Sequence, residues 1–164
     1  MREIKFRAKC KETGEWCYGN LISEINGSEI KTFIHNRVSP VSFTENSLTS
    51  GLVLFEVDPE TVGQYTGVAD KNGRSIFDGQ AVLITGEQEL DFGLFFQWND
   101  KAVVRWSDDE CGYYLDVINK REVSLCQDGY FTVDTFPLRK WDEEEWSIEY
   151  EVMDNPDLLG EVRE

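Results

Sequence analysis

The chain has 164 residues, of which 40% are hydrophobic and 13% are aromatic. This composition excludes a disordered chain, and the length is sufficient to bury a core without disulfide bonds. Sixteen basic and thirty-two acidic residues give a net charge of −16. Because this charge repels phosphate backbones, direct nucleic-acid binding is not expected, whereas a basic partner protein is compatible with it.

The N-terminal segment MREIKFRAKC is charged and lacks the apolar core of a signal peptide, and no later run has the length of a membrane span. We therefore expect a cytoplasmic protein. The four cysteines are Cys10, Cys17, Cys111 and Cys126. In a reducing compartment they are expected to be thiols, and they form no C-x-x-C pair. Since His35 is the only histidine, we expect no metal and no cofactor.

The first predicted strand is EIKFRAKCK, in which apolar residues alternate with cations. The apolar residues are Ile4, Phe6, Ala8 and Cys10, and the cations are Lys5, Arg7, Lys9 and Lys11. This period of two is typical of a strand with one face in a core and the other in water. The cations are therefore expected to form a stripe on the water-facing side.

Two more strands are predicted on either side of Asn26-Gly27, a dipeptide typical of tight hairpins. Residues 36–51 are rich in Ser, Thr, Asn and Pro and are predicted to form a loop. The short apolar segment LVLFEV is predicted to be a further strand. Residues 1–56 are thus expected to form an N-terminal β-meander.

Residues 57–75, VDPETVGQYTGVADKNGRS, form an unusually polar segment. Asp58 is predicted to cap a single helical turn that begins at Pro59. The candidate interaction residues of this segment are Thr61, Gln64, Tyr65 and Thr66. Their polar groups suit either a binding site or a corner in which they satisfy the backbone, and the corner is the simpler interpretation. The DKNG sequence lacks the remaining ligands of a calcium loop and predicts an Asn-Gly turn.

The rest of the chain is predicted to consist of short strands about ten residues apart, the spacing of a small barrel or a sandwich. The strand segments are AVLIT, LFFQW, KAVVRW, GYYLDVI, YFTVDTF and WSIEYEV. Turns are predicted at Asp78-Gly79 and Asn99-Asp100. In WSIEYEV every second residue is apolar, which predicts one buried face. The later segment NPDLLG is predicted to form at most one helical turn.

Nine of the sixteen net negative charges lie in residues 141–164. The candidate residues of this segment are Asp142, Glu143, Glu144 and Glu145, between Trp141 and Trp146. Four consecutive acids are most simply a solvated surface. The alternatives are a cation site, an acid pair of the glycosidase type, or a mimic of the phosphates of DNA.

The cation stripe also has two interpretations. Lys5 and Arg7 could contact nucleic acid, with Trp16 and Tyr18 of the next strand stacking on bases. Alternatively, the stripe pairs with Glu149, Glu151 or the acidic turn, within the chain or across a subunit boundary. The negative net charge favours pairing, and opposite charge blocks at the two ends would suit a head-to-tail homo-oligomer.

Five segments together resemble the YopX-like family, small proteins of bacteriophages and prophages. They are IKFRAK, EWCYG, VDPETVGQYTGVADKNGRSIFDGQAVLI, VVRW and IEYEVMDNPDLL. The resemblance runs from about Arg2 to Leu159, apart from residues 36–50. It implies a mainly β fold with an SH3-like barrel in residues 57–164, a phage or prophage origin and homo-oligomers, and it implies no particular activity. The family often has an acid where this chain has Gln80.

Three functions are compatible with these observations. The preferred one is a non-catalytic, oligomeric protein-interaction module. The second is an acidic DNA mimic that blocks a host DNA-binding protein through its C-terminal carboxylates. The third is a small enzyme that uses carboxylates, or Cys17 and His35, in a pocket.

Overall fold

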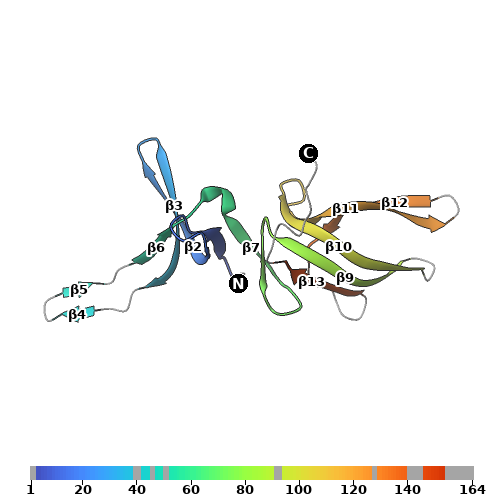
Figure 1. Ribbon diagram of the computed structural model, residues 1–164, viewed down its shortest axis with the longest axis horizontal. Coiled ribbons are helices and arrows are strands. Elements are labelled where there is room, and N and C mark those ends of the chain that lie inside the picture. The colour runs from blue at the N-terminus through green and yellow to red at the C-terminus, as the bar shows by residue number, and fades with distance from the viewer. Residues whose placement is uncertain are drawn as a thin grey trace. The chain divides into compact units, whose positions relative to one another are not determined.

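In the computed structural model, the described residues are 3–38, 42–44, 47–49, 52–90, 94–126, 129–139 and 146–153. They confirm a mainly β protein with a single 3-10 turn among them (Figure 1). The chain divides into two compact units, Met1–Tyr65 and Thr66–Glu164. In the part of the chain that the structure describes, no helix is long and apolar enough to span a membrane.

The first unit is built around an antiparallel sheet with the strand order β6-β3-β2-β1-β7. The elements are β1 (Phe6–Lys9), β2 (Trp16–Asn26), β3 (Glu29–Val38), β4 (Ser42–Thr44), β5 (Ser47–Thr49), β6 (Leu52–Glu56), the 3-10 turn η1 (Pro59–Thr61) and β7 (Gly63–Ala69). Strand β7 begins in the first unit and ends in the second. The predicted hairpin between β2 and β3 is confirmed. Asn26 pairs with Glu29, so Gly27 lies in the tight turn between the two strands, where its φ is +65°.

The predicted loop over residues 36–51 is only partly correct. Strand β3 continues to Val38 and pairs with β6, and the short strands β4 and β5 pair with each other. Three-residue strands are too short to show a period of two, so the composition of this segment concealed them.

The core of the first unit is small. Its fully buried residues are Ala8, Ile34 and Val57, and the partly buried residues around them are Phe6, Cys17, Leu21, Phe55 and Val62. Two predictions for the first strand were wrong: Ile4 is 64% exposed, whereas Arg7 is only 8% exposed. Ile4 precedes β1 and so escapes the sheet, and the guanidinium of Arg7 lies 4.2 Å from the ring centre of Trp16.

The boundary between the units lies after Tyr65, not after Glu56 as the sequence analysis placed it. Val57 is part of the first core, and the start of β7 pairs with β1. The predicted cap is confirmed, since the Glu60 N–H donates to Asp58 Oδ1 at 3.1 Å and the turn begins at Pro59.

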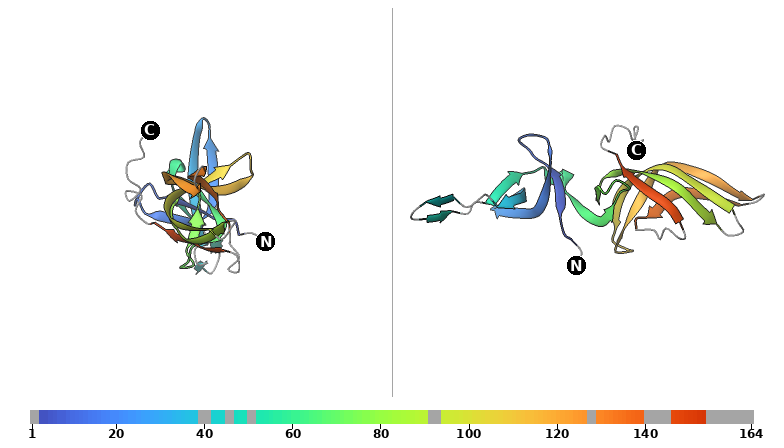
Figure 2. Two further views of the ribbon diagram at one scale, coloured as in Figure 1. Left: turned by 90° about the vertical axis from the view of Figure 1, so that its right-hand side faces the viewer. Right: turned by 90° about the horizontal axis from the view of Figure 1, so that it is seen from below.

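The second unit contains a five-stranded antiparallel sheet with the order β12-β11-β10-β9-β13. Its elements after β7 are β8 (Ser75–Phe77), β9 (Ala81–Leu90), β10 (Leu94–Ser107), β11 (Gly112–Cys126), β12 (Gly129–Pro137) and β13 (Trp146–Val152). Strand β13, in red, runs beside β9, in green (Figure 2). Trp98 anchors the core, with ring centres 4.8 Å from Phe96 and 4.4 Å from Phe136.

The described strand pairs of the second unit leave its sheet open, with β12 and β13 at the edges, so an SH3-like barrel is not confirmed. The predicted face of WSIEYEV is confirmed by the burial of Ile148, Tyr150 and Val152. The predicted turn at Asn99-Asp100 is wrong, because β10 runs straight through it. Asp100 is 2% exposed and accepts hydrogen bonds from Arg121, which removes the cost of burying its carboxylate inside the strand.

Strand β13 lies tightly against β9 at Gly86. Its φ is +130°, and a Cβ there would overlap the carbonyl oxygen of Ser147. We expect Gly86→Ala to lower the free energy of unfolding by at least about 2 kcal/mol, because the two strands must separate. Urea denaturation measures this loss.

Gly112→Ala is the matched control, because a Cβ at Gly112 meets only the Glu110 carbonyl oxygen at 3.7 Å. Equal stability of the two alanine variants would contradict the close approach at Gly86.

Candidate interaction surfaces

The two threonine hydroxyl groups of the predicted polar corner bond to the backbone. Thr61 Oγ1 accepts from Lys9 N at 2.8 Å and donates to the Asp58 carbonyl at 2.7 Å. In the second unit, Thr66 Oγ1 donates to the Ile76 carbonyl at 2.9 Å and accepts from a backbone N–H. These bonds support the interpretation of both threonines as structural residues.

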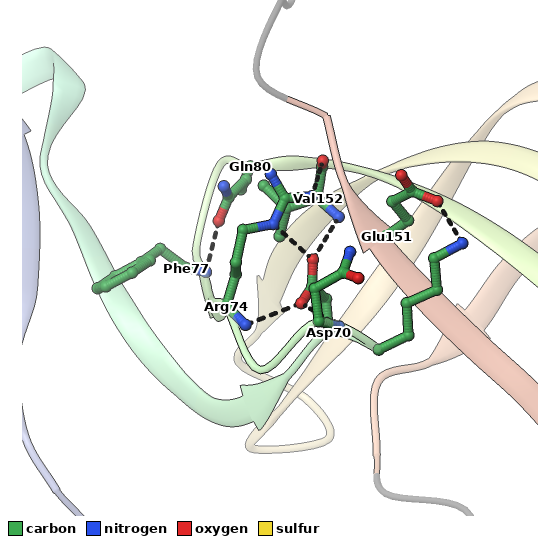
Figure 3. Close-up of polar contacts among 8 residues, drawn as sticks. Asp70, Arg74, Phe77, Gln80, Glu151 and Val152 are labelled. Carbon is green, nitrogen blue, oxygen red and sulfur yellow. Dashed lines mark hydrogen bonds and ion pairs between the residues drawn. The ribbon is translucent and has the colours of Figure 1, made fainter.

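Asp70 is the centre of the DKNG corner in the second unit (Figure 3). Its buried carboxylate accepts from Asn72 N and Arg74 N through Oδ1, at 2.9 and 2.8 Å. Oδ2 accepts from Arg74 Nε at 2.9 Å and from Val152 N at 3.1 Å. Because Arg74 also donates to the Val152 carbonyl at 2.6 Å, the turn is joined to β13. Both carboxylate oxygens therefore have structural donors, so the corner is explained without calcium.

Burial raises the pKa of Asp70, but hydrogen bonds from Val152, Arg74 and Asn72 outweigh burial and lower the pKa below its ordinary value of 3.8. Next to it, Lys71 forms an ion pair with Glu151, and this hydrogen bond raises the pKa of Lys71. Glu151, which the sequence analysis considered as a partner of the cation stripe, is thus already paired within the second unit.

Gln80 closes the next turn of the chain, after β8 (Figure 3). Its side chain is 8% exposed, and Oε1 accepts from Phe77 N at 3.0 Å. The Gln80 side chain thus has a structural role in this turn, and a carboxylate here would accept the same hydrogen bond.

The first unit brings cations and aromatic rings together on one face of its sheet. We define the cation–aromatic face as Lys5, Arg7, Lys9, Trp16, Tyr18 and Tyr65. The cations lie on and just before β1, and β1 lies between β2 and β7. Register places Arg7 opposite Tyr18 and Lys9 opposite Trp16. Trp16 is 38% exposed and Tyr18 is 46% exposed.

The cations of this face lie over the rings. Lys5 Nζ is 4.5 Å from the ring centre of Tyr65, and Lys9 Nζ is 5.6 Å from that of Trp16. The described ion pairs of the stripe are with acids of the same unit, Lys5 with Glu3 at 3.5 Å and Lys11 with Glu56 at 2.9 Å. The bond from Lys11 lowers the pKa of Glu56.

Strand register separates the proposed thiol–imidazole pair. Cys17 lies opposite Ala8 on the core face, whereas His35 lies opposite Asn20 on the other face of the sheet. The structure therefore does not bring Cys17 and His35 together. The acidic candidates Asp142–Glu145 lie outside the described residues.

A shallow cavity of about 440 Å³ lies in the second unit. It is lined by Ser107, Glu110, Tyr114, Thr135, Phe136 and Pro137. Among the described lining residues Glu110 is the one carboxylate, so these residues form no acid pair of the glycosidase type.

Sequence analysis missed a pair of exposed isoleucines at the end of the β2–β3 hairpin. Ile25 and Ile30 lie directly opposite each other and are 73% and 64% exposed. The available signal was their position beside the turn, beyond the reach of strands that could cover them. We call this pair the hairpin tip.

Replacement of Asp70 by Asn tests the corner. We expect Asp70→Asn to lower the free energy of unfolding at pH 7 by about 1–3 kcal/mol, because a buried charged acceptor of four hydrogen bonds is lost. Because folding lowers the pKa of Asp70, its carboxylate stabilises the fold at pH values above the ordinary carboxyl pKa. This contribution is lost as the pH falls through the pKa of the folded state. The difference between wild type and variant, measured by denaturation from pH 7 to 2, should therefore shrink below about pH 4.

The exposed Asp109, changed to Asn, is the control. A difference for Asp70→Asn that stays constant over this pH range would contradict the assigned charge.

Neither a curated protein nor a solved structure matches the chain. The family described as YopX protein matches residues 5–138, which includes the opening strand and the polar corner. Since this match covers most of the chain, the protein belongs to the YopX family.

Proposed function

We propose that this protein is a phage- or prophage-encoded accessory protein of the bacterial cytoplasm that works by binding proteins, including copies of itself, and not by catalysis. The observation that carries the proposal is the distribution of exposed large hydrophobic side chains. Among the described residues, seven of the eight belong to the first unit: Ile4, Trp16, Tyr18, Ile25, Ile30, Val53 and Leu54. Concentrated apolar exposure is typical of an interaction surface.

The hairpin tip is the centre of the proposed self-association. Strand β1 pairs with β2 only up to Gly19, and β6 pairs with β3 only as far as Phe33. The outer part of the hairpin therefore has no further described strand beside it, and its end extends past the sheet in Figure 1. Burial of an isoleucine side chain contributes about 1.5–3 kcal/mol, so covering Ile25 and Ile30 in a dimer is favourable.

Charge also favours contact through the first unit. Residues 1–65 contain seven basic and nine acidic residues, a net charge of −2. Residues 66–164 contain nine basic and twenty-three acidic residues, a net charge of −14. Two copies that meet through the second unit repel each other strongly, whereas two that meet through the first unit do not.

The test is sedimentation velocity of the double variant Ile25→Thr/Ile30→Thr over a range of protein concentrations. We expect a self-dissociation constant at least about tenfold higher than that of the wild type, because apolar area is lost from the contact. Ile4→Thr is the matched control, since Ile4 is as exposed as Ile30 but lies outside the hairpin. A monomeric wild type at tens of micromolar, or equal weakening by the control, would overturn self-association through the hairpin tip.

The acidic DNA mimic is the second candidate, and the charge of the second unit favours it. Fourteen of the sixteen net negative charges belong to residues 66–164. A host protein with a basic DNA groove would be attracted to this charge. Its test is capture from host lysate with wild type and with a variant in which Glu143, Glu144 and Glu145 are changed to Gln. Capture of a DNA-binding protein that is lost in the variant and competed by duplex DNA supports the mimic, and unchanged capture contradicts it.

A further inference from the structure

We propose that the cation–aromatic face of the first unit binds single-stranded nucleic acid. This function is additional to protein binding and uses the opposite side of the sheet from the hairpin tip, because Ile25 continues the face of Leu21 and Cys17 along β2. The ligand class is a single-stranded polynucleotide, DNA or RNA, held by base stacking and by contacts to phosphate.

The arrangement of the face supplies both kinds of contact. Strand β1 carries Arg7 and Lys9, and the aromatic rings lie on the strands at either side, Trp16 and Tyr18 on β2 and Tyr65 on β7. Arg7 is only 8% exposed and lies against Trp16, so Lys5 and Lys9 are the cations of this face that can contact phosphate. Single-strand binders combine cations that follow the phosphates with aromatic rings on which the bases stack. Trp16 and Tyr18 are 38% and 46% exposed, so ring surface is available to a ligand.

The spacing of the two exposed rings suits neighbouring bases. Trp16 and Tyr18 are two residues apart on one strand and point to the same face, so their Cα atoms are about 6.8 Å apart. This is roughly twice the 3.4 Å rise per base of a stacked duplex strand, and an extended single strand can reach it whereas a stacked duplex cannot. The geometry therefore selects single strands.

The rings also argue against a cationic ligand. The guanidinium carbon of Arg7 lies 4.2 Å from the ring centre of Trp16, and Lys5 Nζ lies 4.5 Å from that of Tyr65. These positions hold the protein's own cations over the rings. A ligand with negative charge and flat apolar faces complements this surface, and a nucleotide has both.

The net charge of the whole chain opposes nucleic-acid binding by this face only in part. Residues 1–65 carry a net charge of only −2 of the total of −16. At physiological salt the field of exposed charges decays over about 8 Å, so acidic residues farther than this from the face act weakly on it. Of the carboxylates on this side of the sheet, Glu3 is paired with Lys5 and Glu56 with Lys11, and Glu24 lies six residues beyond Tyr18 on β2. Binding should therefore be weak and strongly dependent on salt.

The experiment measures the fluorescence anisotropy of 5′-labelled dT20 and U20 with the full-length protein in 50 and 200 mM salt. We expect both oligonucleotides to bind at 50 mM and to bind several-fold more weakly at 200 mM, and a labelled duplex to bind at least tenfold more weakly than dT20. A difference between dT20 and U20 identifies the preferred sugar.

Two variants test the face itself. Tyr18→Leu keeps an apolar residue on the strand and should weaken binding of dT20 by about five- to tenfold, the lower part of the range for one stacked base. Lys9→Gln should weaken binding and make it less dependent on salt. Trp106→Leu is the matched control, because Trp106 is 43% exposed but lies in the second unit. Thermal unfolding checks that each variant is folded.

Three outcomes would overturn the proposal: no anisotropy change at 50 mM salt, equal loss in Tyr18→Leu and in Trp106→Leu, or equal affinity for duplex. A loss in Lys9→Gln alone, with polyglutamate competing as well as dT20, would identify an acidic protein surface as the ligand and would also overturn it. Ile25→Thr/Ile30→Thr should leave dT20 binding unchanged, so failure of the proposed self-association and failure of this inference are distinguishable.

Discussion

The second unit depends on one buried carboxylate. Asp70 is enclosed, yet it remains charged because four N–H groups donate to it. Those donors come from its own turn and from β13, which lies more than seventy residues later in the chain. The same interaction therefore closes a local turn and fixes the edge of the five-stranded sheet. A polar, loop-like sequence is required here because the fold needs a charged acceptor inside a tight corner.

The first unit has the opposite character. Its fully buried side chains are Ala8, Ile34 and Val57, a core that is too small to cover both faces of a sheet with long strands. Apolar side chains are consequently left at the hairpin tip and on the cation–aromatic face. Sheets that expose apolar side chains without a covering layer are typical of surfaces that another molecule completes. The small core and the proposed binding function are thus two aspects of one arrangement.

Local patterns predicted the local features. The cap at Asp58, the DKNG turn and the buried face of WSIEYEV depend only on neighbouring residues, and all three were confirmed. Features that depend on distant partners were missed. The sequence Asn99-Asp100 is typical of a turn, but here it lies inside a strand because Arg121, on another strand, neutralises the Asp100 carboxylate. The alternating pattern predicts Arg7 to be a solvated cation, but Trp16 of the neighbouring strand covers it. The exposure of Ile25 was missed because it follows from where the neighbouring strands stop, and the one local signal was its position beside the turn.

The distribution of charge connects these features to function. The second unit is kept away from other copies and from nucleic acid by a net charge of −14, and the first unit, at −2, is not. A contact surface evolves most easily where long-range repulsion is weakest, and this is where the exposed isoleucines, tryptophan and tyrosine are found. If two copies associate as proposed, the acidic unit has a physical role even without a ligand of its own, since its charge limits how many copies can approach. In that proposal the first unit binds and the second restrains binding, and the two roles require opposite surface charges on the same chain.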